Sequence, residues 1–209
     1  MLRHILFDLD ETLYPRGNGL MLAIGSRMED YISTCLNISH AEAIEIRRRY
    51  YQQYGTTLRG LYVEHQINPA HYLAYVHDVP LGNYLQPDSL LRATLARIPQ
   101  EKYIFTNSDS NHASRILNAL GIADQFTRIF DIHFFELQNK PSLFAYRRVL
   151  DALEAQANEC ALVEDTVRNL EPAHRLGIKT ILVDAVGEAD ACIETIYGVA
   201  GAVEQLDRE

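Results

Sequence analysis

The chain has 209 residues, and its 47% hydrophobic content can bury the core of one large domain or of a core with a small insert. With 19 basic against 28 acidic residues the formal charge is −9, which argues against a nucleic-acid polymer or an anionic membrane as the partner. Three cysteines without C-x-x-C spacing fit neither a disulfide scaffold nor a zinc site. The sequence also shows no signal-peptide apolar region and no apolar run of membrane-spanning length, so we expect a cytoplasmic protein.

The first predicted element is a short strand that turns abruptly acidic. Residues 5–7 (Ile-Leu-Phe) suit a buried strand, and Asp8, Asp10 and Glu11 follow before Pro15 ends the segment. Because side chains alternate along a strand, Asp8 and Asp10 point the same way where the strand ends. Two adjacent carboxylates repel and require a cation or a proton between them. In parallel α/β sheets the carboxyl ends of strands bind ligands, so this segment predicts a site, with a solvated acidic turn as the alternative.

Residues 16–84 show helix signals and no convincing strand. The loop 16–19 is predicted to be a flexible linker. Apolar residues recur at three- and four-residue steps over 21–35, which predicts an amphipathic helix. The capping box at 39–42 and the Asn-Pro pair at 68–69 each predict the start of a further helix. This part of the chain therefore predicts a small all-helical unit inserted after the first strand.

Helix and strand signals alternate from residue 87 onward, except in the segment from Gly187, which we could not assign. Such alternation predicts an α/β fold with a parallel, doubly wound sheet covered by helices. We expect an α/β core of residues 1–15 and 85–209 and a helical unit of residues 16–84. The predicted helices cover 87–97, 109–120, 140–153 and 169–176, and the predicted strands cover 102–105, 129–135, 160–163 and 178–183.

Polar residues stand at three further strand ends or helix starts. Thr106 and Asn107 follow a strand, where hydroxyls and exposed amides can bind phosphate oxygens, although the run Thr-Asn-Ser-Asp is also ordinary N-cap chemistry. Lys140 precedes a proline and could be merely a solvated charge. Glu164 and Asp165 follow a strand, although acidic residues also favour helix N-termini. A doubly wound sheet would gather all of these at one edge.

Taken in order, these four groups resemble the motifs of the haloacid dehalogenase-like (HAD) phosphohydrolases. They are Asp-x-Asp-x-Thr at 8–12, Thr106, Lys140-Pro141 and Glu164-Asp165. The extension Phe-Asp-Leu-Asp-Glu-Thr-Leu-Tyr-Pro at 7–15 is similar to the pyrimidine 5′-nucleotidase-like branch, whereas most relatives carry Gly in place of Glu11. The resemblance spans nearly the whole chain. It implies a Rossmann-like HAD core in which the helical unit is the cap.

The resemblance implies a Mg²⁺-dependent phosphatase. Asp8 would attack phosphorus and form an aspartyl phosphate, and Asp10 would act first as acid and then as base, which requires a raised pKa. The Asp8 carboxylate, the Asp10 backbone carbonyl and Asp165 would hold Mg²⁺, with Glu164 in the outer shell or reaching the ion through water. Close relatives often carry two Asp in place of Glu164-Asp165, so the metal shell stays open.

The remaining implied roles belong to phosphate binding. Thr106 and the nearby amides, including Asn107, would bind the transferring oxygens, and Lys140 would balance the charge on Asp8 and on the phosphoryl group. Haloalkanoate dehalogenation involves no acid–base residue like Asp10, so this residue favours phosphoryl chemistry. A phosphosugar phosphatase, a phosphosugar mutase and a non-enzymatic phosphate-binding scaffold remain alternatives.

The segment 54–61 (Tyr-Gly-Thr-Thr-Leu-Arg-Gly-Leu) is predicted to be an inter-helix turn in the cap. It resembles the cap segment of pyrimidine 5′-nucleotidase-like proteins, which implies a nucleoside monophosphate such as UMP or CMP as substrate. Arg59 and Thr57 would then contact the substrate. The alternative is a solvated turn with an incidental arginine. Either a monomer or a homodimer is compatible with the sequence.

Overall fold

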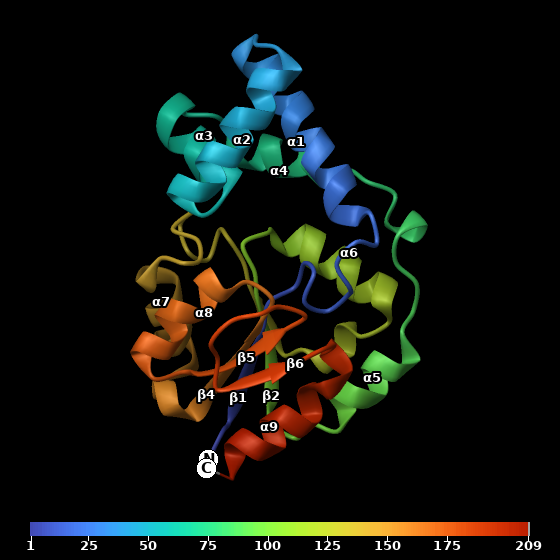
Figure 1. Cartoon of the computed structure of the whole chain (residues 1–209), viewed down its shortest axis with the longest axis vertical. Coiled ribbons are helices and arrows are strands. Elements are labelled where there is room, and N and C mark those ends of the chain that lie inside the picture. The colour runs from blue at the N-terminus through green and yellow to red at the C-terminus, as the bar shows by residue number, and fades with distance from the viewer. Residues whose placement is uncertain (209) are drawn as a thin grey trace. The chain divides into compact units, whose positions relative to one another are not determined.

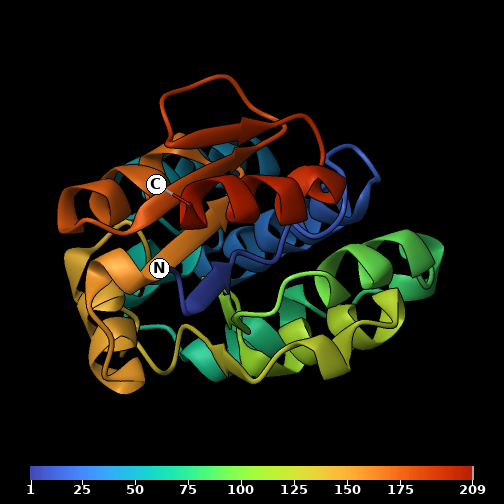
Figure 2. The same cartoon turned by 90° about the horizontal axis from the view of Figure 1, so that it is seen from below.

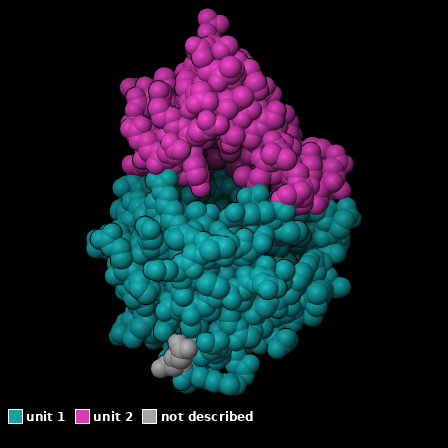
Figure 3. All heavy atoms as spheres, in the orientation of Figure 1, with its two compact units in different colours: residues 1–16, 85–209 teal, residues 17–84 magenta. Residues whose placement is uncertain are grey.

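The computed structural model describes residues 1–208, which divide into two compact units (Figure 3). One unit combines Met1–Arg16 with the chain from Leu85 onward, and the other is Gly17–Tyr84. Among residues 1–208, no helix combines the length and the apolar composition needed to cross a membrane.

The first unit is built on a sheet to which the described residues contribute six strands, all parallel, in the order β3-β2-β1-β4-β5-β6 (Figure 1). Phe7 pairs with Ile104 on one side and with Val163 on the other, so β1, β2 and β4 end at the same edge. The predicted α/β fold class is therefore confirmed. The strands are β1 His4–Phe7, β2 Glu101–Phe105, β3 Arg128–Phe130, β4 Cys160–Glu164, β5 Lys179–Val183 and β6 Ala191–Ile193.

Helices cover both faces of this sheet (Figure 2). Because side chains alternate along strands, Leu6, Phe105 and Leu162 face one side, where they form a buried core with Tyr146 of α7 and Leu170 of α8. The intervening strand residues turn to the opposite face. Apolar residues on both faces explain the continuous apolar runs that marked these strands in the sequence. The helices are α5 Ser89–Ala96, α6 Ser110–Leu120, α7 Leu143–Leu153, α8 Val167–Leu176 and α9 Val199–Asp207.

The second unit, residues 17–84, is helical, and no strand forms within this fully described range. Ser39 and Glu42 form the expected capping box, and Asn68 caps the helix that begins at Pro69. Its helices are α1 Leu20–Leu36, α2 His40–Tyr54, α3 Thr57–His65 and α4 Pro69–Val76.

The turn expected over residues 54–61 is limited to Gly55 and Thr56, because α2 runs to Tyr54 and α3 begins at Thr57. The Thr56 hydroxyl caps this helix by accepting a hydrogen bond from the Arg59 amide at 3.2 Å. Gly60 lies against Tyr50, and a Cβ added at Gly60 would come within 2.3 Å of the Tyr50 ring. This glycine therefore permits close packing of two helices and does not mark a turn.

The strand expected over 129–135 is also too long, because β3 ends at Phe130. Asp131 interrupts it: its Oδ1 accepts a hydrogen bond from the Phe134 amide at 2.9 Å, and its Oδ2 accepts one from the Ser110 amide at 3.0 Å. Phe135 is buried in the core without belonging to a strand. The apolar residues over 129–135 therefore predicted burial correctly, but the strand they predicted is longer than β3.

Two further differences concern α7 and the C-terminal segment. The helix expected from residue 140 begins at Leu143. The unassigned segment from Gly187 contains the short edge strand β6 and helix α9. Helix α9 begins at Val199, and the preceding Gly198 offers no side chain to cap it, so the sequence lacks the usual polar start signal there.

Candidate active site

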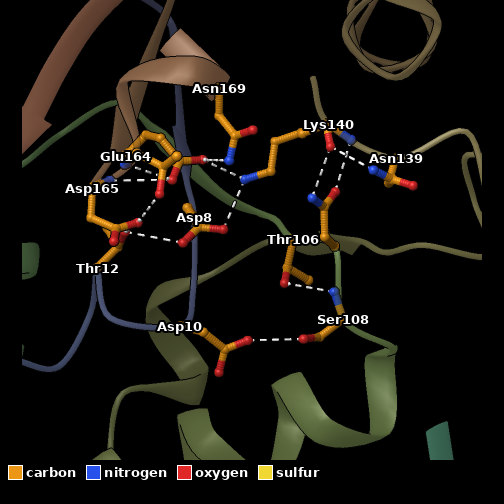
Figure 4. A network of polar contacts seen from close by, with 12 residues as sticks. Asp8, Asp10, Thr12, Thr106, Ser108, Asn139, Lys140, Glu164, Asp165 and Asn169 are labelled. Atoms are coloured by element: carbon orange, nitrogen blue, oxygen red, sulfur yellow. Dashed lines mark hydrogen bonds and ion pairs between the residues drawn. The ribbon is translucent and has the colours of Figure 1, made fainter. Parts of the chain in front are cut away.

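The ends of three neighbouring strands bring the predicted catalytic residues together (Figure 4). Asp8 follows β1, Thr106 follows β2, and Glu164 ends β4 just before Asp165. The loop before α7 adds Lys140, which points its ammonium group toward Asp8 and Glu164 (Figure 4).

Lys140 is wholly buried and forms two ion pairs. Its Nζ lies 2.8 Å from Asp8 Oδ1 and 2.7 Å from Glu164 Oε2. Although burial opposes the charged form, the two carboxylates raise the pKa of Lys140, so the ammonium stays protonated. Burial raises the pKa of Asp8 to about 6; Lys140 opposes this rise and Asp165 adds to it. Because Lys140 limits the rise in the pKa of Asp8, this buried carboxyl group can ionise near neutral pH.

Both oxygens of Glu164 are engaged within the protein. Oε1 accepts hydrogen bonds from the amides of Asp165 and Thr166, each at 3.2 Å. Oε2 accepts one from Asn169 Nδ2 at 3.1 Å in addition to the Lys140 pair. Burial and the charge on Asp8 raise the pKa of Glu164 well above its usual value. These contacts hold the Glu164 carboxylate in place, and its position in the outer shell of a metal site stays a prediction.

Asp8, Glu164 and Asp165 form a buried acidic cluster that fits a divalent cation. One carboxylate oxygen of each lies within 4.8 Å of the others. The Thr12 hydroxyl lies 3.0 Å from Asp8 Oδ2 and 3.2 Å from Asp165 Oδ1, and its single proton can bridge to only one of them at a time. Carboxylate oxygens are the ligands that Mg²⁺ prefers, so the donor set agrees with the predicted cofactor.

Arg16 also belongs to this cluster, although its sequence position did not predict this role. Its Nε donates to Asp165 Oδ2 at 3.0 Å, and its terminal nitrogen donates to the same oxygen and, at 2.9 Å, to the Asp165 backbone carbonyl. The prediction of a flexible linker over 16–19 is therefore wrong for Arg16. A basic residue placed directly after the acidic loop was the available signal.

Asp10 has surroundings quite different from those of Asp8. The Tyr14 hydroxyl donates to Asp10 Oδ1 at 2.8 Å, His112 Nε2 lies 3.0 Å from the same oxygen, and the Ser108 hydroxyl donates to Oδ2 at 2.8 Å. Burial and the charge on Asp10 raise the pKa of Tyr14, so its hydroxyl keeps its proton. None of these three neighbours was predicted as a site residue, although Ser108 belongs to the polar run after β2.

The polar run after β2 holds the loop that carries Lys140. The Asn107 side chain pairs with the Lys140 backbone, accepting from its amide at 2.8 Å and donating to its carbonyl at 3.1 Å. Asn139 Nδ2 donates to the same carbonyl at 2.6 Å. Buried Thr106 accepts a hydrogen bond from the Ser108 amide at 3.0 Å. Direct contact of Thr106 and Asn107 with a substrate stays a prediction.

The two predicted cap residues lie in the second unit, on α3. Thr57 is buried and Arg59 is half-buried. Thr57 is the first residue of α3, and the Arg59 amide donates to the Thr56 hydroxyl that caps this helix. The start of the helix therefore fixes the backbone of both residues. Their contact with a substrate also stays a prediction.

Comparison with known proteins gives consistent matches. The sequence model of the haloacid dehalogenase-like hydrolases matches residues 2–177. Phosphate metabolism protein 8 from Saccharomyces cerevisiae is 30% identical over 192 residues, which cover 84% of this chain and 60% of that protein. The chain thus spans less than two thirds of the length of this relative.

Several solved structures share the fold. An HAD phosphatase from Thermococcus onnurineus has a TM-score of 0.66 at 18% identity, covering 97% of this chain and 98% of that one. The HAD-hydrolase YfnB from Bacillus subtilis, bound to magnesium, has a TM-score of 0.67 at 15% identity over 97% and 99%. L-2-haloacid dehalogenase from Xanthobacter autotrophicus has a TM-score of 0.63 at 14% identity over 98% and 99%. At these identities the likeness shows the fold alone.

Proposed function

This chain belongs to the haloacid dehalogenase-like hydrolases, and from that premise we propose that it hydrolyses small phosphate monoesters through an aspartyl phosphate. The observation that carries this proposal is the contrast between Asp8 and Asp10. Asp8 is paired with the buried Lys140 ammonium, whereas Asp10 accepts hydrogen bonds from neutral side chains. Two nearby carboxylates in different environments can take the separate roles of nucleophile and proton carrier.

In the first step an Asp8 carboxylate oxygen attacks phosphorus while the bond from phosphorus to the leaving oxygen breaks. Asp10 gives its proton to that oxygen. In the second step water attacks the phosphorus of the aspartyl phosphate and gives a proton to Asp10, and the bond between Asp8 and phosphorus breaks to release inorganic phosphate. Lys140 offsets negative charge on Asp8 and on the phosphoryl group in both steps.

Asp8, Asp165 and the backbone carbonyl of Asp10 would hold Mg²⁺, with Glu164 behind them. When bound, the ion neutralises charge on the phosphoryl oxygens. The protein residues supply the rest: Glu164, which accepts a hydrogen bond from Asn169, orients the lysine, and Thr12 orients Asp8 and Asp165.

For the substrate we propose a pyrimidine nucleoside 5′-monophosphate, with Arg59 donating to the base or stacking on it. The stretches at 7–15 and 54–61 support this choice through their resemblance to pyrimidine 5′-nucleotidases. A phosphosugar phosphatase or mutase would share the chemistry of Asp8 and Asp10 and differ in the cap. The retained acid–base residue favours phosphate esters over haloalkanoates.

A substrate panel tests the proposal. The purified protein with Mg²⁺ would be offered UMP, CMP, purine monophosphates, sugar phosphates, p-nitrophenyl phosphate and 2-chloropropionate, and release of phosphate or chloride would be measured. We expect phosphate release, fastest with the pyrimidine monophosphates, and none from Asp8→Asn. Chloride release without phosphate release would overturn the proposed chemistry, and faster turnover of sugar phosphates would overturn the proposed substrate.

A further inference from the structure

We propose that Tyr14 and His112 are positioning residues that fix Asp10 so that its transferable proton sits on Oδ2. This inference rests on the proposed function, in which Asp10 gives that proton to the leaving oxygen. The two residues would act through Asp10 and need not touch the substrate.

The two oxygens of Asp10 have different partners. Oδ1 lies 2.8 Å from the Tyr14 hydroxyl and 3.0 Å from His112 Nε2. A carboxylate oxygen has two acceptor sites, and a hydroxyl and a ring N–H can fill both. In the tautomer of His112 that carries its proton on Nε2, both sites are taken and Oδ1 has no site left for a proton of its own.

Oδ2 faces Ser108, whose hydroxyl lies 2.8 Å away (Figure 4). A hydroxyl can donate to ionised Asp10 and accept from protonated Asp10. Oδ2 can therefore gain and lose a proton without leaving its neighbour unsatisfied. The asymmetry between the two oxygens assigns the mobile proton to Oδ2.

The surrounding fold makes this arrangement rigid. Tyr14 and His112 are 2% and 1% exposed, so neither side chain has solvent to turn into. His112 stands in the first turn of α6, where its amide donates to the capping Asp109 at 3.0 Å. The Ser108 amide donates to Thr106 at 3.0 Å. Rotation of Asp10 away from Tyr14, His112 and Ser108 would break three hydrogen bonds at once.

The dependence on the leaving group tests this inference. p-Nitrophenolate leaves readily without a proton, whereas an alkoxide needs one. We would measure kcat/KM of the Mg²⁺-loaded wild type, Tyr14→Phe and His112→Asn with p-nitrophenyl phosphate and with an alkyl phosphate such as UMP. Each variant should lose about tenfold or more on the alkyl ester and less than about threefold on the nitrophenyl ester, since general acid catalysis contributes up to several powers of ten.

A control substitution and a conservative substitution separate a positioning role from a general effect on the fold. His4→Gln changes another buried histidine, 7% exposed at the amino end of β1, and should affect both esters equally. Tyr14→Phe keeps the ring and removes one hydroxyl, so it decides the question even where His112→Asn fails to fold. Equal losses on both esters would overturn the inference and leave the phosphatase proposal standing. A wild type inactive on both esters would overturn the two together.

Discussion

The ammonium of Lys140 lies 2.8 Å from Asp8 Oδ1, and the lysine side chain has no exposed surface. A third partner, Glu164, completes a buried group of one cation and two carboxylates. Because each of the two carboxylates pairs with this one lysine, both the fold and the proposed chemistry depend on it.

Lys140→Met should destabilise the metal-free protein by about 3–5 kcal/mol, the usual cost of leaving a buried charge without its partner. Urea unfolding followed by circular dichroism would measure the free energy of unfolding. Arg92→Met is the matched control, because it removes a cation from an exposed pair with Asp124 and should change stability far less than Lys140→Met does. Equal effects of the two substitutions would show that the buried pairs contribute no more than a surface pair.

Metal-free protein should lose stability as the pH rises from about 4 to about 6. The folded-state pKa of Asp8 is raised by burial from 3.8 to about 6, and that of Glu164 is raised in the same direction. In this window the folded state binds more protons than the unfolded state, so unfolding becomes easier as pH increases. The stabilisation that protonated Asp8 gives is complete below the pKa of the unfolded state, and it is lost as the pH rises through the pKa of the folded state.

Mg²⁺ should reverse this trend, because it replaces the protons among the same carboxylates. The rise in Tm on adding Mg²⁺ should therefore be larger at pH 7.5 than at pH 5, as measured by thermal unfolding with and without the ion. A Tm shift that is equal at both pH values, or larger at pH 5, would mean that the ion binds elsewhere.

The core of this site could be predicted because its parts follow local rules. Parallel strands bring Asp8, Thr106 and Glu164 to the same edge. Asp10 lies beyond the end of β1 at Phe7, where strand alternation no longer sets the direction of its side chain. The partners of Asp165 and Asp10 follow no such rule. Arg16 meets Asp165 across 149 positions of sequence, and His112 meets Asp10 across 102. Such contacts depend on side-chain directions, which spacing does not specify.

The errors in the fold have equally local causes. Gly60 favours a turn by its residue type, whereas in the structure it allows α3 to pack against Tyr50. Phe135 continues an apolar run that predicts a strand, and in the structure it is buried in a turn. Apolar residues are buried in both strands and turns, so hydrophobicity alone does not show where a strand ends and a turn begins.

Arg16→Ala should raise the affinity for Mg²⁺, because the guanidinium holds an oxygen of the expected ligand Asp165. The gain should be about tenfold, on the order of the repulsion between a single and a double positive charge a few ångströms apart in water. Calorimetric titration of substrate-free protein measures it, with Arg92→Ala as a charge-matched control. Weaker binding by Arg16→Ala would instead make the arginine a support for the ligand Asp165.

Arg59→Ala should lower kcat/KM for UMP and CMP and leave p-nitrophenyl phosphate unaffected, because the latter has neither ribose nor base. Losing a hydrogen bond from a charged donor costs about 1–3 kcal/mol, and binding energy from a remote contact can appear in kcat as well as in KM. Arg48→Ala is the control within the cap, since that side chain is 63% exposed and pairs only with Glu45 among the ion pairs described. Equal losses on nucleotide and nitrophenyl esters would place Arg59 in the fold of α3 or at the phosphate. No loss on either would leave the nucleotidase proposal without a specificity residue in the cap.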